Sequence, residues 1–303
     1  MIDFQPLDLT NKAAYDRLLQ CAGERGCEYS FVNLYLWGRQ KAAFIGDHLV
    51  FFSQFHRRTV YLFPVGSGDK KPVLDAVIAD AKERGIPCRF TGIRPGEETV
   101  LESLYPGKFR LHPDRDSFDY VYDIHDLADL KGKKFQKKRN HLNRFWQNHP
   151  DAVAEPITSE NCAEAAALVE RWYEMRLAAD PNADFQMEMA AIRKAFAHRE
   201  ELGMEGMLLS CSGEAVAVAL GSRLSENTFD IHFEKALDIA DGAYAAINNS
   251  FAKYLREKYP EIAYLNREDD MGLEGLRKAK LSYNPHHLVE KGWAHLQEDG
   301  YDY

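Results

Sequence analysis

The order of predicted strands and helices constrains the fold of this chain more than any other feature. Alternation of apolar and polar residues predicts strands, and apolar residues that recur every three to four positions predict helices. After an N-terminal helix, the first half follows the order hairpin, helix, strand, helix, strand. Its predicted elements are a helix over 12–21, an apolar segment over 30–37, strands over 49–55 and 59–65, a helix over 71–84, a strand over 88–93, a helix over 97–105 and a strand over 116–123.

The second half repeats this order. No repeat of individual residues accompanies it, which excludes a short-period solenoid. We therefore predict an α/β (α+β) chain of two structurally similar units, each with a mixed central sheet. The predicted elements are helices over 163–177 and 187–198, strands over 206–211, 215–223 and 228–234, a helix over 243–258, a strand over 262–265, a helix over 273–281 and a last strand near 287–292.

The length of 303 residues, with 45% apolar residues, is sufficient for two hydrophobic cores and excludes a disordered chain. We predict an N-terminal domain over 1–130, a basic connecting helix over 131–150 and a C-terminal domain over 151–303. Pro150 ends the connecting helix. A groove between the two domains, beside this helix, is the expected ligand site.

The location and the cysteine chemistry also follow from composition. No apolar run approaches the roughly 18 to 20 residues that cross a bilayer, and the first residues do not read as a signal peptide. We therefore expect a cytoplasmic protein without a transmembrane segment. His286 and His287 lack a carboxylate at metal-ligand spacing, and no metal site is expected. The cysteines are odd in number and scattered, so we expect structural roles, and no disulfide framework, for Cys21, Cys27, Cys88, Cys162 and Cys211.

A basic run contrasts with the acidic remainder of the chain. The formal net charge is −9, yet residues 131–144 contain seven basic residues and no acid. The run could be an ordinary solvated helix face, but it lacks the acidic residues that usually pair with lysines one helical turn away. We therefore expect a polyanion to bind it. The candidate contacts are Lys133, Lys134, Lys137, Lys138, Arg139, Asn140 and Arg144.

The segment 229–234 alternates between apolar and ionisable residues. In a regular strand, Asp230, His232 and Glu234 share one face. The preceding strand is apolar at successive positions over 215–220, which favours burial of its neighbour as well. An acid beside an imidazole in a partly closed groove suits proton transfer, so these three residues are the predicted catalytic set. A solvent-facing strand or a structural salt-linked cluster remains an alternative.

A second polar segment follows the predicted strand over 262–265. Ligands of α/β sheets collect beyond the carboxyl ends of strands, which makes Asn266, Arg267 and Glu268 candidate substrate contacts. Asp269 or Asp270 can instead cap the next helix. Capping does not explain Asn266 or Arg267, and arginine is a good clamp for phosphate or carboxylate. The following helix adds a weaker positive surface that includes Arg277, Lys278 and Lys280.

Three segments together resemble a known family. They are 132–144 (GKKFQKKRNHLNR), 230–233 (DIHF) and 265–277 (LNREDDMGLEGLR), and they are similar to the C-terminal domain of phosphatidylglycerol lysyltransferases. The resemblance covers nearly the whole chain and implies two fused GNAT-like acyltransferase units. It also implies a more distant relation to the Fem peptidyltransferases, which use aminoacyl-tRNA.

The resemblance also bears on the reaction. The family's best-known members move an amino acid from aminoacyl-tRNA to a lipid hydroxyl and carry an Asp-x-x-Arg pair. Asp230 occupies the aspartate position, whereas Phe233 occupies the arginine position. No counterpart of the lysyltransferases' membrane-spanning part is visible, so a lipid acceptor would be reached from solution.

The donor is the main point that the residues leave open. Ordinary GNAT enzymes bind the coenzyme A pyrophosphate with a Gln/Arg-x-x-Gly-x-Gly/Ala loop at a helix N-terminus. In the equivalent segment 239–244, only Gly242 fits. We therefore expect aminoacyl transfer from tRNA, with no required cofactor, to an amine or hydroxyl of a small molecule, peptide or lipid. The alternatives are a coenzyme A-dependent N-acyltransferase and a non-catalytic tandem GNAT module that binds RNA or protein.

Overall fold

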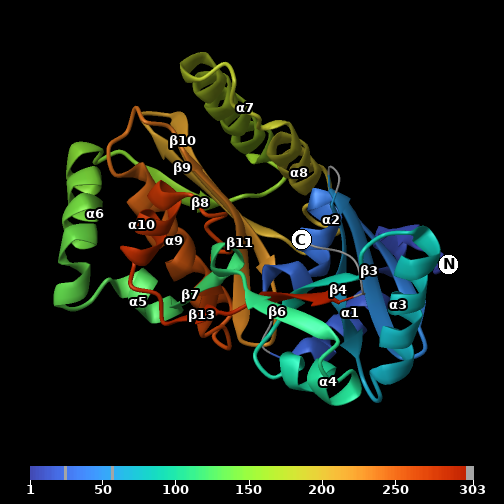
Figure 1. Ribbon diagram of the computed structural model, residues 1–303. Coiled ribbons are helices and arrows are strands. Elements are labelled where there is room, and N and C mark those ends of the chain that lie inside the picture. The colour runs from blue at the N-terminus through green and yellow to red at the C-terminus, as the bar shows by residue number, and fades with distance from the viewer. Residues whose placement is uncertain (24–25, 56–57, 298–303) are drawn as a thin grey trace. The chain divides into compact units, whose positions relative to one another are not determined.

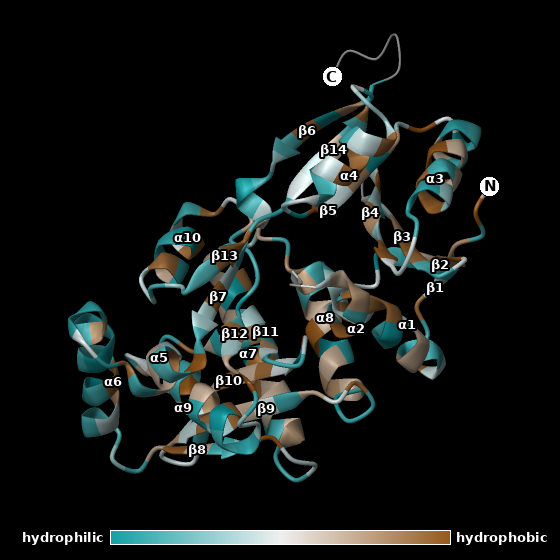
Figure 2. Ribbon diagram, turned by 90° about the horizontal axis from the view of Figure 1, so that it is seen from below, coloured by the Kyte–Doolittle hydropathy of each residue, from teal (hydrophilic) through white to brown (hydrophobic). Residues whose placement is uncertain are grey.

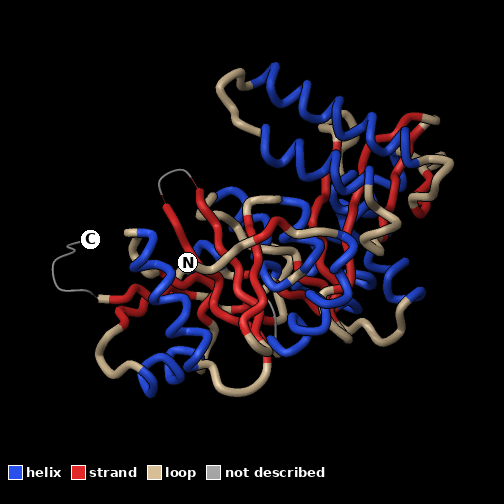
Figure 3. Tube along the Cα trace, turned by 90° about the vertical axis from the view of Figure 1, so that its right-hand side faces the viewer, coloured by secondary structure: helices blue, strands red, loops and turns tan. Residues whose placement is uncertain are grey.

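The computed structural model describes residues 1–23, 26–55 and 58–297 (Figure 1). The chain forms two compact units. The first contains Met1–Asp119, Asp269–Glu274 and the residues from Leu288 onward, and the second contains Tyr120–Glu268 and Gly275–His287. Both units contain helices and strands, which Figure 3 distinguishes by colour. The predicted α/β class is therefore confirmed.

The first unit is built on a seven-stranded mixed sheet in the order β1-β2-β3-β4-β5-β14-β6. The pair β4 and β5 is parallel, and the other pairs are antiparallel. The strands are β1 (Gln5–Pro6), β2 (Gln40–Ile45), β3 (His48–Phe55), β4 (Arg58–Gly66), β5 (Arg89–Ile93), β6 (Phe109–Pro113) and β14 (Gly292–Leu296), and the helices are α1 (Lys12–Leu19), α2 (Phe31–Trp37), α3 (Lys71–Arg84) and α4 (Glu97–Leu104).

The core of the first unit lies between this sheet and helices α3 and α4. Val73, Leu74, Val77 and Ala81 recur on one face of α3, as a helix packed on a sheet requires. They pack with buried aromatic residues of the strands, among them Phe90. The periodicity of the sequence predicted α3 at its observed bounds.

The second unit contains a seven-stranded mixed sheet in the order β13-β7-β12-β11-β10-β9-β8. The pair β11 and β12 is parallel. The strands are β7 (Asp119–Asp123), β8 (Val153–Pro156), β9 (Glu205–Cys211), β10 (Glu214–Arg223), β11 (Thr228–Ala236), β12 (Tyr264–Asn266) and β13 (His287–Val289). The helices are α5 (Ile124–Asp129), α6 (Gln136–Asn148), α7 (Cys162–Ala179), α8 (Gln186–Ala197), α9 (Ala243–Lys258) and α10 (Glu274–Leu281).

The compact units do not follow the predicted limits at residues 130 and 151. β7, from the first half of the sequence, pairs with β12, and β14, from the end of the second half, lies between β5 and β6. The prediction treated each half as continuous, whereas each sheet takes a strand from the other half. The basic helix α6 consequently lies inside the second unit.

A β-bulge in β11 changes which residues share a face. Leu220 of β10 pairs with Phe233, but the next residue, Gly221, pairs with Ile231, so His232 is the extra residue of β11. Ser222 and Asp230 are paired and share one face. Ala219 and Glu234 share the other. The prediction that Glu234 lies on the face of Asp230 and His232 is wrong, because one inserted residue inverts the alternation.

Helices cover both faces of β11. Phe229 packs on Phe251 of α9, with ring centroids 6.3 Å apart, so α9 covers the face that carries Glu234. Lys235 lies on the opposite face, where its Nζ is 4.1 Å from the ring centroid of Trp172 in α7. β10 is buried from Val216 to Ser222, as its apolar sequence predicted.

The start of α9 lies against α6. Gly242 caps α9 with a φ of +90°, a conformation that favours glycine. A Cβ atom at this position would lie 3.0 Å from the carbonyl oxygen of His141 and 3.1 Å from the Cβ of Phe145, both in α6. Gly242 therefore permits both the turn and the close approach of the two helices.

No described helix is long and apolar enough to cross a membrane. The five cysteines are free thiols.

Candidate functional site

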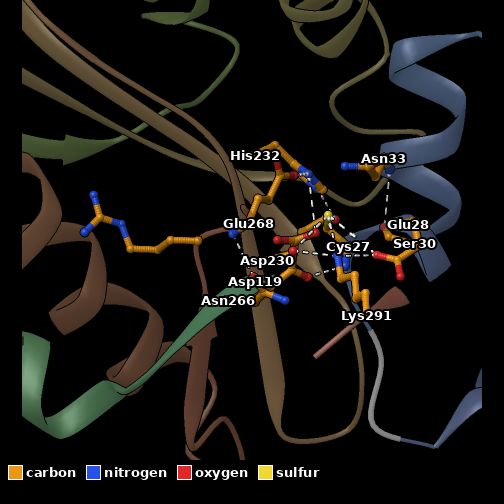
Figure 4. Close-up of polar contacts among 12 residues, drawn as sticks. Cys27, Glu28, Ser30, Asn33, Asp119, Asp230, His232, Asn266, Glu268 and Lys291 are labelled. Carbon is orange, nitrogen blue, oxygen red and sulfur yellow. Dashed lines mark hydrogen bonds and ion pairs between the residues drawn. The ribbon is translucent and has the colours of Figure 1, made fainter. Parts of the chain in front are cut away.

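A cluster of ionisable side chains surrounds the bulge residue His232 in the second unit. Its Nε2 lies 2.8 Å from Ser222 Oγ. Its Nδ1 lies 3.1 Å from Glu268 Oε1 (Figure 4). Asp230 Oδ2 is 3.6 Å from the same Nδ1. The side chains of His232 and Asp230 are 1% and 0% exposed, whereas that of Glu268 is 18% exposed. We call Ser222, Asp230, His232 and Glu268 the bulge cluster.

Glu268 occupies a tightly held turn directly after β12. Its φ is +56°, which is unfavourable for a residue with a side chain. Its N–H donates to Asn266 Oδ1 at 2.7 Å, and its carbonyl accepts hydrogen bonds from the N–H of Tyr120 at 3.1 Å and from Lys280 Nζ at 3.2 Å. Lys280 Nζ also donates to the carbonyl of Arg267. The predicted substrate contacts Asn266 and Lys280 therefore hold the backbone of this turn.

Among the residues that the structure describes, two groups of side chains have the composition of a cation site. Asp230, His232 and Glu268 each offer a ligand atom within 4.8 Å of the others. In the first unit, Cys27, Glu28 and Asp119 do the same. There, however, the ammonium of Lys291 lies 2.7 Å from Asp119 and 2.5 Å from Glu28, so a lysine already supplies the positive charge.

A cavity of about 710 Å³ opens in the second unit between α6 and the start of α9. One wall consists of Lys134, Lys137, Lys138 and His141 from the basic segment. The loop after β11 and the first residues of α9 form a second wall, and Ser282, Tyr283 and Asn284 close a third side. Much of α6 is hydrophilic (Figure 2). The basic segment and the loop with Gly242, which the sequence singled out separately, thus line one cavity.

Tyr283 connects this cavity to a buried ion pair. Lys138 Nζ lies 3.8 Å from the centroid of the Tyr283 ring, and Arg267 Cζ lies 5.0 Å from it. Arg267 Nη2 donates to Glu234 Oε1 at 3.0 Å, and Glu234 also accepts from Asn248 of α9. Burial, and then the charge of Arg267, lower the pKa of Lys138 below the usual lysine value. Arg267 and Glu234, predicted in separate sets, form one pair.

The basic run divides into structural and cavity-facing residues. Arg139 donates to the carbonyls of Leu130 and Gly132 and to Gln136, so it holds the turn between α5 and α6. Acids outside the run pair with three of its members, and the first of these pairs is Lys131 with Asp129 at 2.9 Å. Lys134 pairs with Asp126, and Arg144 pairs with Asp241 at 3.7 Å. Asn140 accepts a hydrogen bond from Gln136. Lys133 and Lys137 are exposed and form no ion pair with any described residue.

The cavity lies beyond the carboxyl end of β11, a strand that parts from its parallel neighbour β12. β11 and β12 pair from Thr228 with Tyr264 to Asp230 with Asn266. β12 then ends, while β11 continues to Ala236 and enters the cavity wall at Leu237. The bulge cluster lies at this divergence. Binding beyond the carboxyl ends of strands is typical of α/β sheets.

Sequence reasoning missed Ser222, His141 and Tyr283 as members of these sites. Ser222 ends the buried, mainly apolar part of β10, and no motif in the sequence marks it as a site residue. Tyr283 follows the basic residues of 277–280 but carries no motif of its own. Arg277 is half-buried in α10 and is not part of the cavity wall.

The family described as "Phosphatidylglycerol lysyltransferase, C-terminal" matches residues 20–294. The chain belongs to this family. Membership supports the acyltransferase activity that the sequence predicted. A curated relative, an uncharacterized protein of Mycoplasmoides gallisepticum (strain R(low / passage 15 / clone 2)), is 27% identical over 179 residues, which are 58% of this chain and 55% of the relative. The chain thus spans about half the length of that relative.

Solved structures share the fold of this member of the lysyltransferase C-terminal family. A conserved protein of unknown function from Bacteroides thetaiotaomicron VPI-5482 is 38% identical, with a TM-score of 0.91 over 98% of this chain and 100% of the other. L-PGS from Bacillus licheniformis is 17% identical, with a TM-score of 0.68 over 98% and 94%. A tandem GNAT protein from the clavulanic acid biosynthesis pathway is 9% identical, with a TM-score of 0.51 over 99% and 100%. The predicted tandem GNAT-like architecture is confirmed.

Proposed function

We propose that this acyltransferase moves an aminoacyl group from aminoacyl-tRNA to an amine or hydroxyl acceptor. The observation that carries the proposal is the cavity with its wall of Lys134, Lys137, Lys138 and His141, next to the start of α9. Cationic side chains and the N–H groups at a helix N-terminus both favour phosphate. An acceptor end of tRNA supplies phosphates and an ester in the same short segment.

The reaction requires little of the protein beyond alignment of the two substrates and transfer of one proton. The ester of aminoacyl-tRNA is already activated, so the enzyme must orient a nucleophile, accept its proton and stabilise the developing oxyanion. We assign phosphate contacts to Lys133, Lys137 and Lys138. We assign proton handling to the bulge cluster, which contains the predicted residues Asp230 and His232. Glu234 leaves this set, because it binds Arg267 on the opposite face of β11.

The acceptor is proposed only as a class. The relative from Bacillus licheniformis carries the name L-PGS, and the family name refers to phosphatidylglycerol. A lipid hydroxyl is therefore one acceptor to test, beside small-molecule and peptide amines. Since aminoacyl-tRNA is a cytoplasmic donor, the proposal places the protein in the cytoplasm, and it requires no cofactor.

One observation favours coenzyme A as a second candidate donor. Gly242 and the first residues of α9 line the cavity, which is where a pyrophosphate would meet a helix N-terminus. Against this, Asp241 is adjacent to Gly242, and its negative charge disfavours a pyrophosphate.

The deciding experiment compares the two donors on one protein preparation. Binding of bulk tRNA and of coenzyme A is measured by fluorescence anisotropy and calorimetry. Transfer from radiolabelled aminoacyl-tRNA and from acetyl-CoA is then followed with ethanolamine, glycerol and phosphatidylglycerol vesicles as acceptors. We expect tRNA binding and aminoacyl transfer. Transfer from acetyl-CoA alone would replace the proposal with the coenzyme A-dependent one, and binding of tRNA without any transfer would favour a non-catalytic RNA-binding module.

A further inference from the structure

We propose that Glu268 is the catalytic base of the transfer and that His232 and Ser222 are positioning residues behind it. This inference rests on the proposed function and deepens it, because it assigns the proton to one atom group of the bulge cluster. A base must come within hydrogen-bond distance of the nucleophile.

The two carboxyl groups of the cluster differ in solvent exposure. The side chain of Asp230 is 0% exposed, and Ser222 and the side chain of His232 are 1% exposed. Glu268, at 18%, is the carboxylate that solvent reaches. It also follows the last residue of β12 by two positions, at the end of the strand where β11 and β12 part. Of the two carboxylates, Glu268 is therefore the one that a nucleophile arriving from solvent meets first.

The backbone of Glu268 supports a functional role. A residue with a side chain at positive φ is strained, and such residues persist where the surrounding structure holds them in place. Three hydrogen bonds hold this conformation: the Glu268 N–H donates to Asn266 Oδ1, and the Glu268 carbonyl accepts from the N–H of Tyr120 and from Lys280 Nζ. The ammonium of the buried Lys280 donates to two consecutive carbonyls, those of Arg267 and Glu268. Burying a charge is energetically unfavourable, which indicates that the conformation of this turn has a function.

The imidazole of His232 orients the Glu268 carboxylate. Nδ1 contacts Glu268 Oε1 at 3.1 Å, and Ser222 Oγ contacts Nε2 at 2.8 Å. With Nδ1 protonated, the ring donates to Glu268 and accepts from the Ser222 hydroxyl, and both ring nitrogens are engaged. His232 thus has no nitrogen left for the nucleophile. It fixes the carboxylate, as the buried partner of a base does in other acyl-transfer sites.

The proposed step balances without any further reactant. The nitrogen or oxygen of the acceptor attacks the ester carbonyl carbon of aminoacyl-tRNA, and a bond forms between them. Glu268 accepts the proton of that nitrogen or oxygen. When the tetrahedral intermediate collapses, the bond between the carbonyl carbon and the ribose oxygen breaks, and the protonated Glu268 returns the proton to that oxygen. The products are the aminoacylated acceptor and free tRNA.

The test compares Glu268→Gln with a matched control, Glu261→Gln. Glu261 is an exposed acid paired with Arg223, and such surface pairs contribute little to stability. With the acceptor probe that supports transfer by the wild-type protein, we expect Glu268→Gln to lower kcat by about 10²- to 10⁴-fold and to leave tRNA affinity unchanged. The acidic limb of the pH–rate profile should disappear in Glu268→Gln. Glu261→Gln should match the wild type in each measurement.

Ser222→Ala separates positioning from catalysis. It removes the contact at Nε2 but leaves Glu268 in place, so we expect the acidic limb to move along the pH axis and kcat to fall less than in Glu268→Gln. A purely structural serine would change the melting temperature and leave the limb where it is. Near-normal kcat with an unchanged acidic limb in Glu268→Gln would overturn the assignment while leaving aminoacyl transfer intact. Absence of transfer by the wild-type protein with every acceptor probe would overturn the proposed function, and the role of Glu268 with it.

Discussion

Asp230 and Glu234 lie on opposite faces of β11, although both are carboxylates of one nine-residue strand. Asp230 lies beside His232, on the face of β11 that also carries Lys235. Trp172 of α7 packs against Lys235 on this face. Glu234 binds Arg267 on the face toward α9. The two acids therefore serve separate environments, one at the bulge and one next to the cavity that Tyr283 and Lys138 line.

Neutralising Glu234 should destabilise the protein. The side chains of Arg267 and Glu234 are only 14% and 10% exposed, and removing one charge of a buried pair leaves the other uncompensated. For Glu234→Gln we expect a loss of about 3 to 5 kcal/mol in the free energy of unfolding, measured by urea denaturation. The double variant with Arg267→Met should recover part of this loss. A loss below about 0.5 kcal/mol, the range of ordinary surface changes, would show that the pair is not important for stability.

Removing four lysines of the basic segment should weaken the salt dependence of tRNA binding. Each phosphate contact contributes about 0.7 to 0.9 to the slope of log affinity against log salt concentration. Because three of these lysines are the assigned phosphate contacts, we expect the joint change of Lys133, Lys134, Lys137 and Lys138 to Ala to flatten that slope by about 2 to 3. Anisotropy titrations at several salt concentrations provide the measurement.

The control for this experiment keeps the change in net charge and moves its location. Exposed lysines elsewhere on the surface serve this purpose, and their joint replacement by Ala should leave most of the slope intact. Equal flattening by both sets would mean that net charge, and not the basic segment, determines binding. The control residues are Lys41, Lys82, Lys108 and Lys253.

Lys138 should make tRNA binding sensitive to alkaline pH. Burial and the charge of Arg267 lower the pKa of Lys138, so as pH rises its ammonium loses its proton earlier than an ordinary lysine does. The contribution of the Lys138 charge to binding is therefore lost at a lower pH than that of an ordinary lysine. In Lys138→Arg the charge persists, and we expect its affinity to fall less between pH 7 and 9.5. Parallel pH profiles of the two proteins would rule out a role for the Lys138 charge.

Lys291 should be important for the stability of the first unit. Burial disfavours its charge, but Asp119, Cys27 and Glu28 raise the pKa of Lys291 well above the usual value. Its stabilising effect is therefore complete below the unfolded-state pKa near 10.4 and decreases only as pH rises through the higher folded-state value. At neutral pH we expect Lys291→Met to cost about 3 to 5 kcal/mol, because Asp119 is fully buried beside it. Calorimetric unfolding that matched the wild type would contradict this.

Periodicity predicted most helices and the central strands because their core-facing residues repeat at regular intervals. The helix α9 begins at Ala243 and ends at Lys258, the predicted bounds. The edge strands β1 and β8 and the short helix α5 were missed, since two to six residues carry too little periodicity. β6 was missed for another reason. Its residues mix exposed positions with a single buried one, Phe109.

The sequence predicted several residues of the site but not their arrangement in space. Asp230, His232, Arg267 and Glu268 were all singled out from the sequence. Alternation assumes one residue per position in both strands, so it could not reveal the bulge that moves Glu234 away. Nor does any local pattern encode the contact between Ser222 and His232, because β10 and β11 meet only through the register of the sheet.

The exchange of strands has a consequence for how this protein can be divided. β14, the last described strand, is an interior member of the first sheet, between β5 and β6. A chain cut at residue 150 would lack it, which exposes the backbone hydrogen-bonding groups of β5 and deprives β6 of its partner. The C-terminal fragment would in turn lack β7 beside β12. Two genes that each encoded one half would therefore have to assemble their products by strand exchange. For the same reason, a substitution at residue 294 in β14 affects the packing of residues 89–113.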